Sequence, residues 1–127
     1  MAQKIAVNEI LICDDSPETR FLLKTVLTNE GFVVLEADDG IVAQELAEKH
    51  CPNLIIMDVV MPGRDGITTI KNLHSNPDTA NIPIIVMTGK PSIVKLLGEA
   101  EVQIKAVIEK PFPLKTLKAT VAEIFND

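Results

Sequence analysis

The stretch Leu54-Ile-Ile-Met-Asp-Val-Val-Met-Pro-Gly-Arg-Asp-Gly66 decides the fold class. It begins with four consecutive apolar residues and then changes abruptly to an acidic residue, Asp58. A short, continuous apolar run is typical of a strand that is buried on both faces, as in a parallel sheet. We therefore expect residues 54–57 to form a central strand that ends at a carboxylate.

Similar short apolar runs recur along the chain and alternate with amphipathic segments. The runs predict further strands at residues 9–13, 32–37, 83–87 and 106–109. The segments between them carry apolar residues at helical spacing, which predicts helices at residues 17–30, 40–49, 66–73 and 92–100, with a last helix from 113 to near the chain end. Five alternating strand–helix units predict a doubly wound α/β fold, in which helices cover both faces of a five-stranded parallel sheet.

Two of these helices have clear local signals. Ser16 is a good N-cap and Pro17 suits the first helical position, while Gly31 ends the same helix. Gly89 and Gly98 bracket the helix at 92–100. The apolar spacing predicts that both helices turn leucine-rich faces inward, made of Leu22, Leu23, Val26 and Leu27 in the first and of Ile93, Val94, Leu96 and Leu97 in the second.

Composition narrows the class of protein. A chain of 127 residues that is 46% hydrophobic fits one globular domain. The formal net charge of −6 argues against direct nucleic-acid binding. The sequence contains neither a signal-peptide pattern nor an apolar run near the ~20 residues of a membrane span, so we expect a cytoplasmic protein. Cys13 and Cys51 lack metal-site spacing, and Cys13 is expected to be a small buried hydrophobe.

Five candidate residues directly follow four of the five expected strands. Asp14 and Asp15 follow the first strand, Asp58 the third, Thr88 the fourth and Lys110 the fifth. The carboxyl ends of parallel strands meet at one edge of the sheet, which is where such folds carry their chemistry. We therefore expect these five side chains to cluster.

Such a cluster has a definite chemical character. Three carboxylates repel one another unless a cation intervenes, and Mg2+ is the hard ion that prefers carboxylate oxygen and water. A lysine and a threonine hydroxyl beside the metal suit the oxygens of a phosphoryl group. A carboxylate held in line could then attack phosphorus and become an acyl phosphate.

Each residue alone has an ordinary explanation. Asp14, Asp15 or Ser16 could cap the first helix, Thr88 could lie in a turn, Lys110 could be a solvated charge, and aspartate is common where a strand meets a turn. Their joint placement at one sheet edge is what favours the functional interpretation.

The chain resembles the receiver domains of two-component response regulators, including chemotaxis regulators, over nearly its whole length. The likeness rests on Ile10-Leu-Ile-Cys-Asp-Asp-Ser-Pro17, the stretch from Leu54 to Gly66, Ile84-Ile-Val-Met-Thr-Gly89 and Glu109-Lys-Pro-Phe112. The second of these, with Met-Pro-Gly-x-Asp-Gly after the aspartate, is the most specific. The resemblance implies a flavodoxin-like strand order of 2-1-3-4-5 and one receiver domain over residues 1–127, with no output domain in this chain.

The resemblance also implies roles for individual residues. Asp58 would be the phosphoacceptor, and Thr88 and Lys110 would hold the phosphoryl group. Mg2+ would be bound directly by Asp15, Asp58 and the backbone carbonyl of Val60, with Asp14 acting through water. A sensor histidine kinase or histidine phosphotransfer protein would supply the phosphoryl group, and an unidentified protein would receive the signal. We expect a monomer or weak dimer that does not bind membranes.

Several positions depart from the family pattern or tune it. Val107 stands where most relatives have an aromatic switch residue, and Gln103-Ile104 stands where a Gly-Ala pair is frequent. We therefore expect the signal to pass through backbone shifts of the helix at 92–100, and to change the surface that this helix forms with the fifth strand and the last helix.

Val60 and Lys90 flank the expected path of attacking water and are expected to slow dephosphorylation. The Lys110–Pro111 bond is expected to be cis.

Two other classes compete with this interpretation. A pseudo-receiver would bind partners without phosphorylation, and the valine at 107 is the observation in its favour. An aspartate-nucleophile phosphatase would need a second acid two residues after the nucleophile, but Val60 cannot transfer a proton. A nucleotide-binding domain is disfavoured because no glycine-rich phosphate loop follows any expected strand.

Overall fold

The computed structural model describes residues 8–61 and 65–126. Its five strands form one parallel sheet in the order β2-β1-β3-β4-β5, which confirms the predicted fold class and strand order. The strands are β1 (Glu9–Cys13), β2 (Val33–Ala37), β3 (Leu54–Asp58), β4 (Ile84–Thr88) and β5 (Ile104–Glu109). Every residue of β3 and β4 is buried, as expected for central strands with both faces covered.

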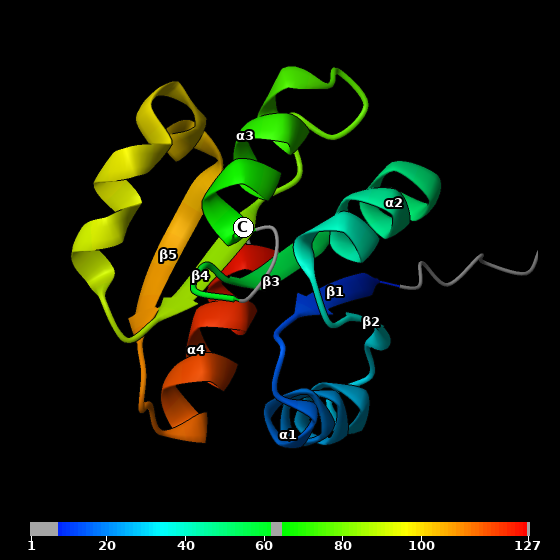
Figure 1. Ribbon diagram of the computed structural model, residues 1–127. Coiled ribbons are helices and arrows are strands. Elements are labelled where there is room, and N and C mark those ends of the chain that lie inside the picture. Colours follow the sequence, from blue (N-terminus) through cyan, green and yellow to red (C-terminus); the bar gives the residue numbers. More distant parts are fainter. Residues whose placement is uncertain (1–7, 62–64, 127) are drawn as a thin grey trace, which may run out of the picture.

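Helices cover both faces of the sheet (Figure 1). They are α1 (Pro17–Asn29), α2 (Gly40–His50), α3 (Gly66–Ser75), the 3-10 helix η1 (Pro91–Gln103) and α4 (Leu114–Phe125). Asp127, where the last helix was expected to end, lies outside the described residues. No helix in the described part of the chain is both long and apolar enough to span a membrane.

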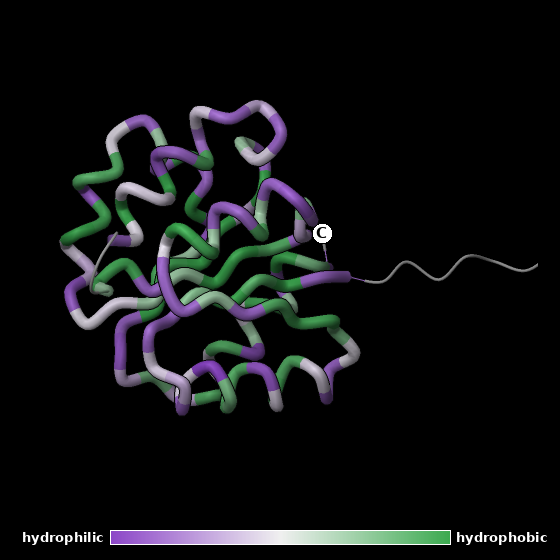
Figure 2. Tube along the Cα trace, turned by 45° about the vertical axis from the view of Figure 1, so that its right-hand side comes forward, coloured by the Kyte–Doolittle hydropathy of each residue, from purple (hydrophilic) through white to green (hydrophobic). Residues whose placement is uncertain are grey.

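The alternation of side chains along each strand divides the core in two. Leu11 and Met57 belong to the cluster that packs under α2, α3 and η1, whereas Ile10 and Ile56 belong to the cluster that packs under α1 and α4. Figure 2 shows the same design, with largely hydrophobic strands at the centre and helices that alternate hydrophilic and hydrophobic stretches. The core is almost purely aliphatic, since the chain has no Trp or Tyr.

Two expected inward-facing leucines are exposed. Leu22 is 45% exposed and Leu96 is 61% exposed, while their neighbours Leu23 and Leu97 are buried. Consecutive residues point about 100° apart in an α-helix and about 120° apart in a 3-10 helix, so only one leucine of each adjacent pair can face the sheet. The prediction that all four point inward was therefore wrong for Leu22 and Leu96.

The segment predicted as an α-helix at residues 92–100 also differs. It is a 3-10 helix that runs from Pro91 to Gln103, and Gly98 lies inside it with φ 59° and ψ −127°, which breaks the helix into two pieces. Gly98 therefore does not bracket this helix but interrupts it. The conformation is one that glycine adopts far more readily than other residues.

Candidate functional site

Parallel pairing brings the carboxyl ends of four strands to one edge of the sheet (Figure 1). Asp58 and Thr88 are the last residues of β3 and β4, and Asp14 and Lys110 directly follow β1 and β5. Of these four residues, Asp14, Asp58 and Thr88 are buried.

Lys110 links the two buried acids across the sheet edge. Its Nζ lies 2.8 Å from Asp14 Oδ2 and 2.9 Å from Asp58 Oδ2. Burial alone lowers the pKa of the Lys110 ammonium, but the hydrogen bonds and charges of Asp14 and Asp58 outweigh it, so this pKa lies above its ordinary value. Lys110 is therefore a cation at neutral pH, between two side chains that lie 44 residues apart in sequence.

The second oxygen of each buried acid binds backbone. Asp14 Oδ1 accepts a 2.9 Å hydrogen bond from Ser16 N, and Asp58 Oδ1 accepts one of 2.9 Å from Val60 N. Both are aspartate turns, in which a carboxylate accepts from the amide two residues later. Each carboxylate is therefore held at both of its oxygens, and each also fixes the backbone amide two residues after it.

Gly66 explains how α3 starts so close to this site. A Cβ at this position would lie 2.6 Å from Val59 Cα and 2.7 Å from the carbonyl oxygen of Asp58, both of which are backbone atoms. Gly66 N donates to the carbonyl of Val59 at 3.2 Å. Only glycine lets the start of α3 lie directly against the chain that carries Asp58. The three residues Pro62, Gly63 and Arg64 of the same motif lie outside the described residues.

Asp15 completes a group that fits a hard divalent cation. Asp14, Asp15 and Asp58 each offer one carboxylate oxygen, and these oxygens lie within 4.8 Å of one another. Asp15 is exposed, and within residues 8–61 and 65–126 no hydrogen bond or ion pair holds its carboxylate. An all-oxygen donor set with one solvent-exposed acid suits Mg2+, which keeps part of its water shell.

Thr88 is placed to donate a hydrogen bond. Its buried Oγ1 accepts a 2.9 Å hydrogen bond from Lys90 N, so the hydroxyl proton remains for another acceptor. Its carbonyl accepts from Lys110 N at 2.9 Å, which couples the ends of β4 and β5. The sequence predicts a cis bond after Lys110, and the Lys110–Pro111 bond is cis in the structure.

The remaining expected residues lie at the rim of this site or beyond it. Val60 and Lys90 are both exposed in the loops that follow β3 and β4. Val107 lies in β5, where its backbone pairs with Val86 and its side chain is 41% exposed.

Cys13 is buried, as predicted, with its Sγ 3.6 Å from Met61 Sδ. Burial, together with the negative charges of Asp14, Asp39, Asp58 and Asp38, raises the pKa of this thiol to about 12. Such a thiol stays protonated at neutral pH, which disfavours a nucleophilic or redox role.

One residue at the site was missed by sequence reasoning. The Nη1 of Arg20, in the first turns of α1, donates a 2.7 Å hydrogen bond to the backbone carbonyl of Asp14. The only sequence signal is an arginine one to two helical turns after the acid pair, which has an ordinary explanation as a solvated helix residue.

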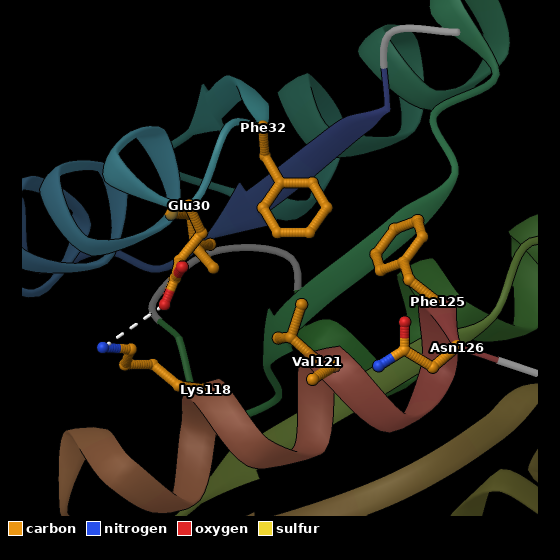
Figure 3. Close-up of a pocket in the computed structure, with 8 residues that line it drawn as sticks. Glu30, Phe32, Lys118, Val121, Phe125 and Asn126 are labelled. Carbon is orange, nitrogen blue, oxygen red and sulfur yellow. Dashed lines mark ion pairs between the residues drawn. The ribbon is translucent and has the colours of Figure 1, made fainter.

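A hollow at the opposite edge of the sheet has a different character. It lies between the end of α1, the start of β2 and the end of α4, and Figure 3 shows the rings of Phe32 and Phe125 beside the Glu30–Lys118 ion pair. The two ring centroids are 4.9 Å apart, and the ion pair measures 3.3 Å. Among the described residues that line it, Glu30 is the only acid, and the hollow lies at the amino end of β2. The chemical site is therefore the acidic edge.

Comparisons with known proteins agree with this geometry. The family model described as "Response regulator receiver domain" matches residues 10–122. The chain is 31% identical to chemotaxis protein CheY-3 of Vibrio cholerae over 119 residues, 93% of this chain and 92% of that protein. It is 33% identical to chemotaxis protein CheY of Bacillus subtilis over 120 residues, 94% of this chain and 98% of that protein.

A solved structure with the same fold carries a ligand of interest. The response regulator TrrA of Thermotoga maritima, in complex with Mg2+ and a beryllium fluoride, superposes with a TM-score of 0.81 at 25% identity, covering 94% of this chain and 100% of that one.

Proposed function

Because this chain belongs to the response regulator receiver domain family, we propose that it is a signalling switch phosphorylated on Asp58. Receiver domains are signalling modules and not classical enzymes. The observation that supports the proposal most directly is the ammonium of Lys110, held 2.8 Å and 2.9 Å from the two buried carboxylates of Asp14 and Asp58. A buried carboxylate with a fixed cation at one oxygen is arranged to meet an anionic group.

The proposed reaction is the transfer of a phosphoryl group from a phosphohistidine of a sensor kinase or phosphotransfer protein. A carboxylate oxygen of Asp58 attacks phosphorus, the bond from phosphorus to the imidazole nitrogen breaks, and its electron pair stays on that nitrogen. Lys110 neutralises one phosphoryl oxygen and the Thr88 hydroxyl donates to another. These two residues thus hold the group that Asp58 accepts.

We propose Mg2+ as the cofactor, held directly by Asp15, Asp58 and the carbonyl of Val60, with Asp14 acting through water. The ion would neutralise charge that the three acids and the phosphoryl oxygens bring together. Support comes from the three convergent carboxylate oxygens and from the Mg2+ complex of the TrrA relative.

The test is intact mass after incubation with acetyl phosphate and Mg2+. We expect a single phosphate adduct on the wild-type protein, none on Asp58→Asn and none when the metal is chelated. Asp38→Asn is a matched control, because Asp38 is an exposed acid that follows β2 at the same edge. An adduct that survives in Asp58→Asn, or that forms without metal, would disprove the assignment.

Val107 favours one alternative, a pseudo-receiver that binds partners without phosphorylation, because the usual aromatic relay is missing. The two functions separate in the same experiment. If no phosphodonor modifies Asp58 while a partner still binds, the pseudo-receiver is the better description.

We also propose how the signal leaves the site. Movement of Thr88 toward the phosphoryl group would shift the backbone of η1 and so change the surface formed by η1, β5 and α4. Amide chemical shifts with and without beryllofluoride and Mg2+ test this in wild type and Val107→Ala. Changes across residues 89–103 in both proteins would support it, and changes confined to the loops around Asp58 would contradict it.

The acyl phosphate is proposed to be long-lived. Val60 offers no side-chain group to orient an attacking water, and the exposed Lys90 can reach over the phosphoryl oxygens. Dephosphorylation rates of Val60→Asn and Lys90→Ala, compared with wild type, check this. If neither substitution speeds the loss of phosphate, the shielding role is wrong.

Finally, we propose that residues 1–127 act as one receiver domain in the cytoplasm, as a monomer or weak dimer, with a protein rather than nucleic acid as its downstream target. Light scattering after size exclusion, at two protein concentrations and with and without beryllofluoride, tests the oligomeric part of this proposal.

A further inference from the structure

Arg20 contacts two partners beside the acidic edge, the backbone of Asp14 and the side chain of Glu36. Its side chain is only 18% exposed, its Nη1 lies 2.7 Å from the carbonyl oxygen of Asp14, and its Nε lies 3.4 Å from Glu36 Oε1. Glu36 also pairs with Lys24 at 3.4 Å. The guanidinium therefore joins the end of β1, the first turns of α1 and the strand β2.

The carbonyl oxygen that Arg20 binds belongs to the peptide group that joins Asp14 to Asp15. The carbonyl of Asp14 and the amide of Asp15 share one rigid peptide plane, so fixing the carbonyl oxygen fixes the orientation of that plane. The side chain of Asp14 is already held by Ser16 N and Lys110. The carboxylate of Asp15 has no such anchor in the described part of the chain, so its direction depends on the backbone.

We propose that Arg20 is a positioning residue that aims Asp15 at the cation site. This role rests on the Mg2+ site proposed above, and Arg20 itself lies outside the set of proposed Mg2+ ligands. The Arg20 fork can bind a carbonyl and a carboxylate together, which a lysine ammonium cannot do in the same planar geometry. Removing it frees the 14–15 peptide plane and spreads the directions in which Asp15 points.

Charge alone predicts the opposite result. A guanidinium close to three acids repels an incoming cation, so its removal should tighten Mg2+ binding if Arg20 acted only through its charge. Loss of positioning should weaken binding instead. The sign of the change in Mg2+ affinity therefore separates the two roles.

The experiment is calorimetric titration of the whole protein with MgCl2. We expect Arg20→Met to raise the Mg2+ Kd by roughly tenfold, as for loss of other residues that orient metal ligands. Arg20→Lys keeps the charge and loses the fork, and its Kd should lie between those of Arg20→Met and wild type. Lys24→Met removes a positive charge from the same cluster without contact to Asp14, and it should bind Mg2+ as wild type does or slightly more tightly.

Other variants separate failure of this inference from failure of the proposed function. Asp15→Asn should lose Mg2+ binding while the protein stays folded. If wild type does not bind Mg2+, the proposed site itself fails, and Arg20 has nothing to position. If wild type binds and both Arg20 variants bind as tightly or more tightly, only the positioning role is overturned. Should Arg20→Met not fold, Arg20→Lys alone decides, because charge predicts no change for it.

Discussion

The corners that follow β1 and β4 start from similar sequence and end in different structure. Each leads from a polar residue at the sheet edge into a helix whose first residue is proline, Pro17 in α1 and Pro91 in η1. In α1, Ser16 accepts a 3.2 Å hydrogen bond from Thr19 N, and a regular α-helix follows. In η1, Lys90 provides no side-chain cap, and a 3-10 helix follows.

The anchors of the two corners also lie at different places. The α1 corner is fixed beside the acids, where Asp14 is held by Ser16, Arg20 and Lys110. The η1 segment is fixed at its far end, where the buried Gln103 donates to the carbonyls of Thr79 and Ile82 at 3.2 Å and 3.1 Å.

The difference shows that a proline start does not by itself produce an α-helix, and that the capped start is the one followed by a regular α-helix in this pair. The less regular helix, η1, follows Thr88, whereas the regular helix α1 follows the acids Asp14 and Asp15. This division supports the proposal that the signal leaves the site through η1.

The largest expected effect comes from truncating the matched buried leucines of the two helices. Leu23→Ala and Leu97→Ala each remove a large side chain from the core, at a cost of about 2–5 kcal/mol in the free energy of unfolding. We expect Leu97→Ala to lie at the low end, because η1 is interrupted at Gly98 and can relax into the space. Urea denaturation followed by circular dichroism measures both, and a larger loss for Leu97→Ala would break the comparison.

The anchor of η1 gives the next largest effect. Gln103→Ala removes the donor to two buried carbonyls, which should lower the free energy of unfolding by about 1–3 kcal/mol. Amide hydrogen exchange should quicken mainly at residues 99–103. Glu101→Ala, an exposed neighbour, is the control. If exchange instead quickens equally in α1, Gln103 is not a local anchor.

The helix starts themselves should respond unequally. Ser16→Ala removes the cap of α1 and should cost about 1 kcal/mol of stability. Lys90→Ala is the matched change at the start of η1, and we expect it to stay within about 0.5 kcal/mol of wild type because no cap is lost. Equal effects in thermal unfolding would mean that Lys90 supports η1 in a way that the comparison leaves out.

The smallest expected effect is on the labelling of Cys13, which reports whether the end of β1 beside the acids opens. The pKa of buried Cys13, raised to about 12, keeps its thiol neutral at pH 8, whereas Cys51 is exposed. A maleimide should therefore label Cys51 quickly and leave Cys13 unmodified, with no change when Mg2+ and beryllofluoride are added. Labelling of Cys13 on addition of beryllofluoride would show that the end of β1 beside the acids moves too.

The same thiol predicts a pH dependence. The free energy of unfolding should fall from pH 9 upward, because the thiol of the unfolded chain ionises there while the buried thiol of the folded protein does not.

Much of the fold was predictable from local pattern. The apolar runs and helical spacings located the ten helices and strands of the described residues, although η1 was expected to be an α-helix, because burial on one or two faces imposes a period on the sequence. The sheet edge then followed from topology, which is why Asp14, Asp15, Asp58, Thr88 and Lys110 could be named as a group. The strand order was implied by the family resemblance, and the pairing in the structure confirms it.

Other features depend on contacts that no local pattern records. Packing between elements decides which leucine of each adjacent pair is covered and where η1 is kinked. It also decides why Gly66 cannot carry a side chain and which carbonyl Arg20 binds.

The sequence by itself therefore determined the class of fold and the chemical composition of the acidic edge, since periodicity and strand ends are properties of the chain. Only the tertiary structure decided which atoms hold each acid, because a hydrogen bond depends on distances of a few tenths of an ångström between residues that packing brings together. The bonds of Lys110 to Asp14 and Asp58, and of Arg20 to the Asp14 carbonyl, exist for that reason.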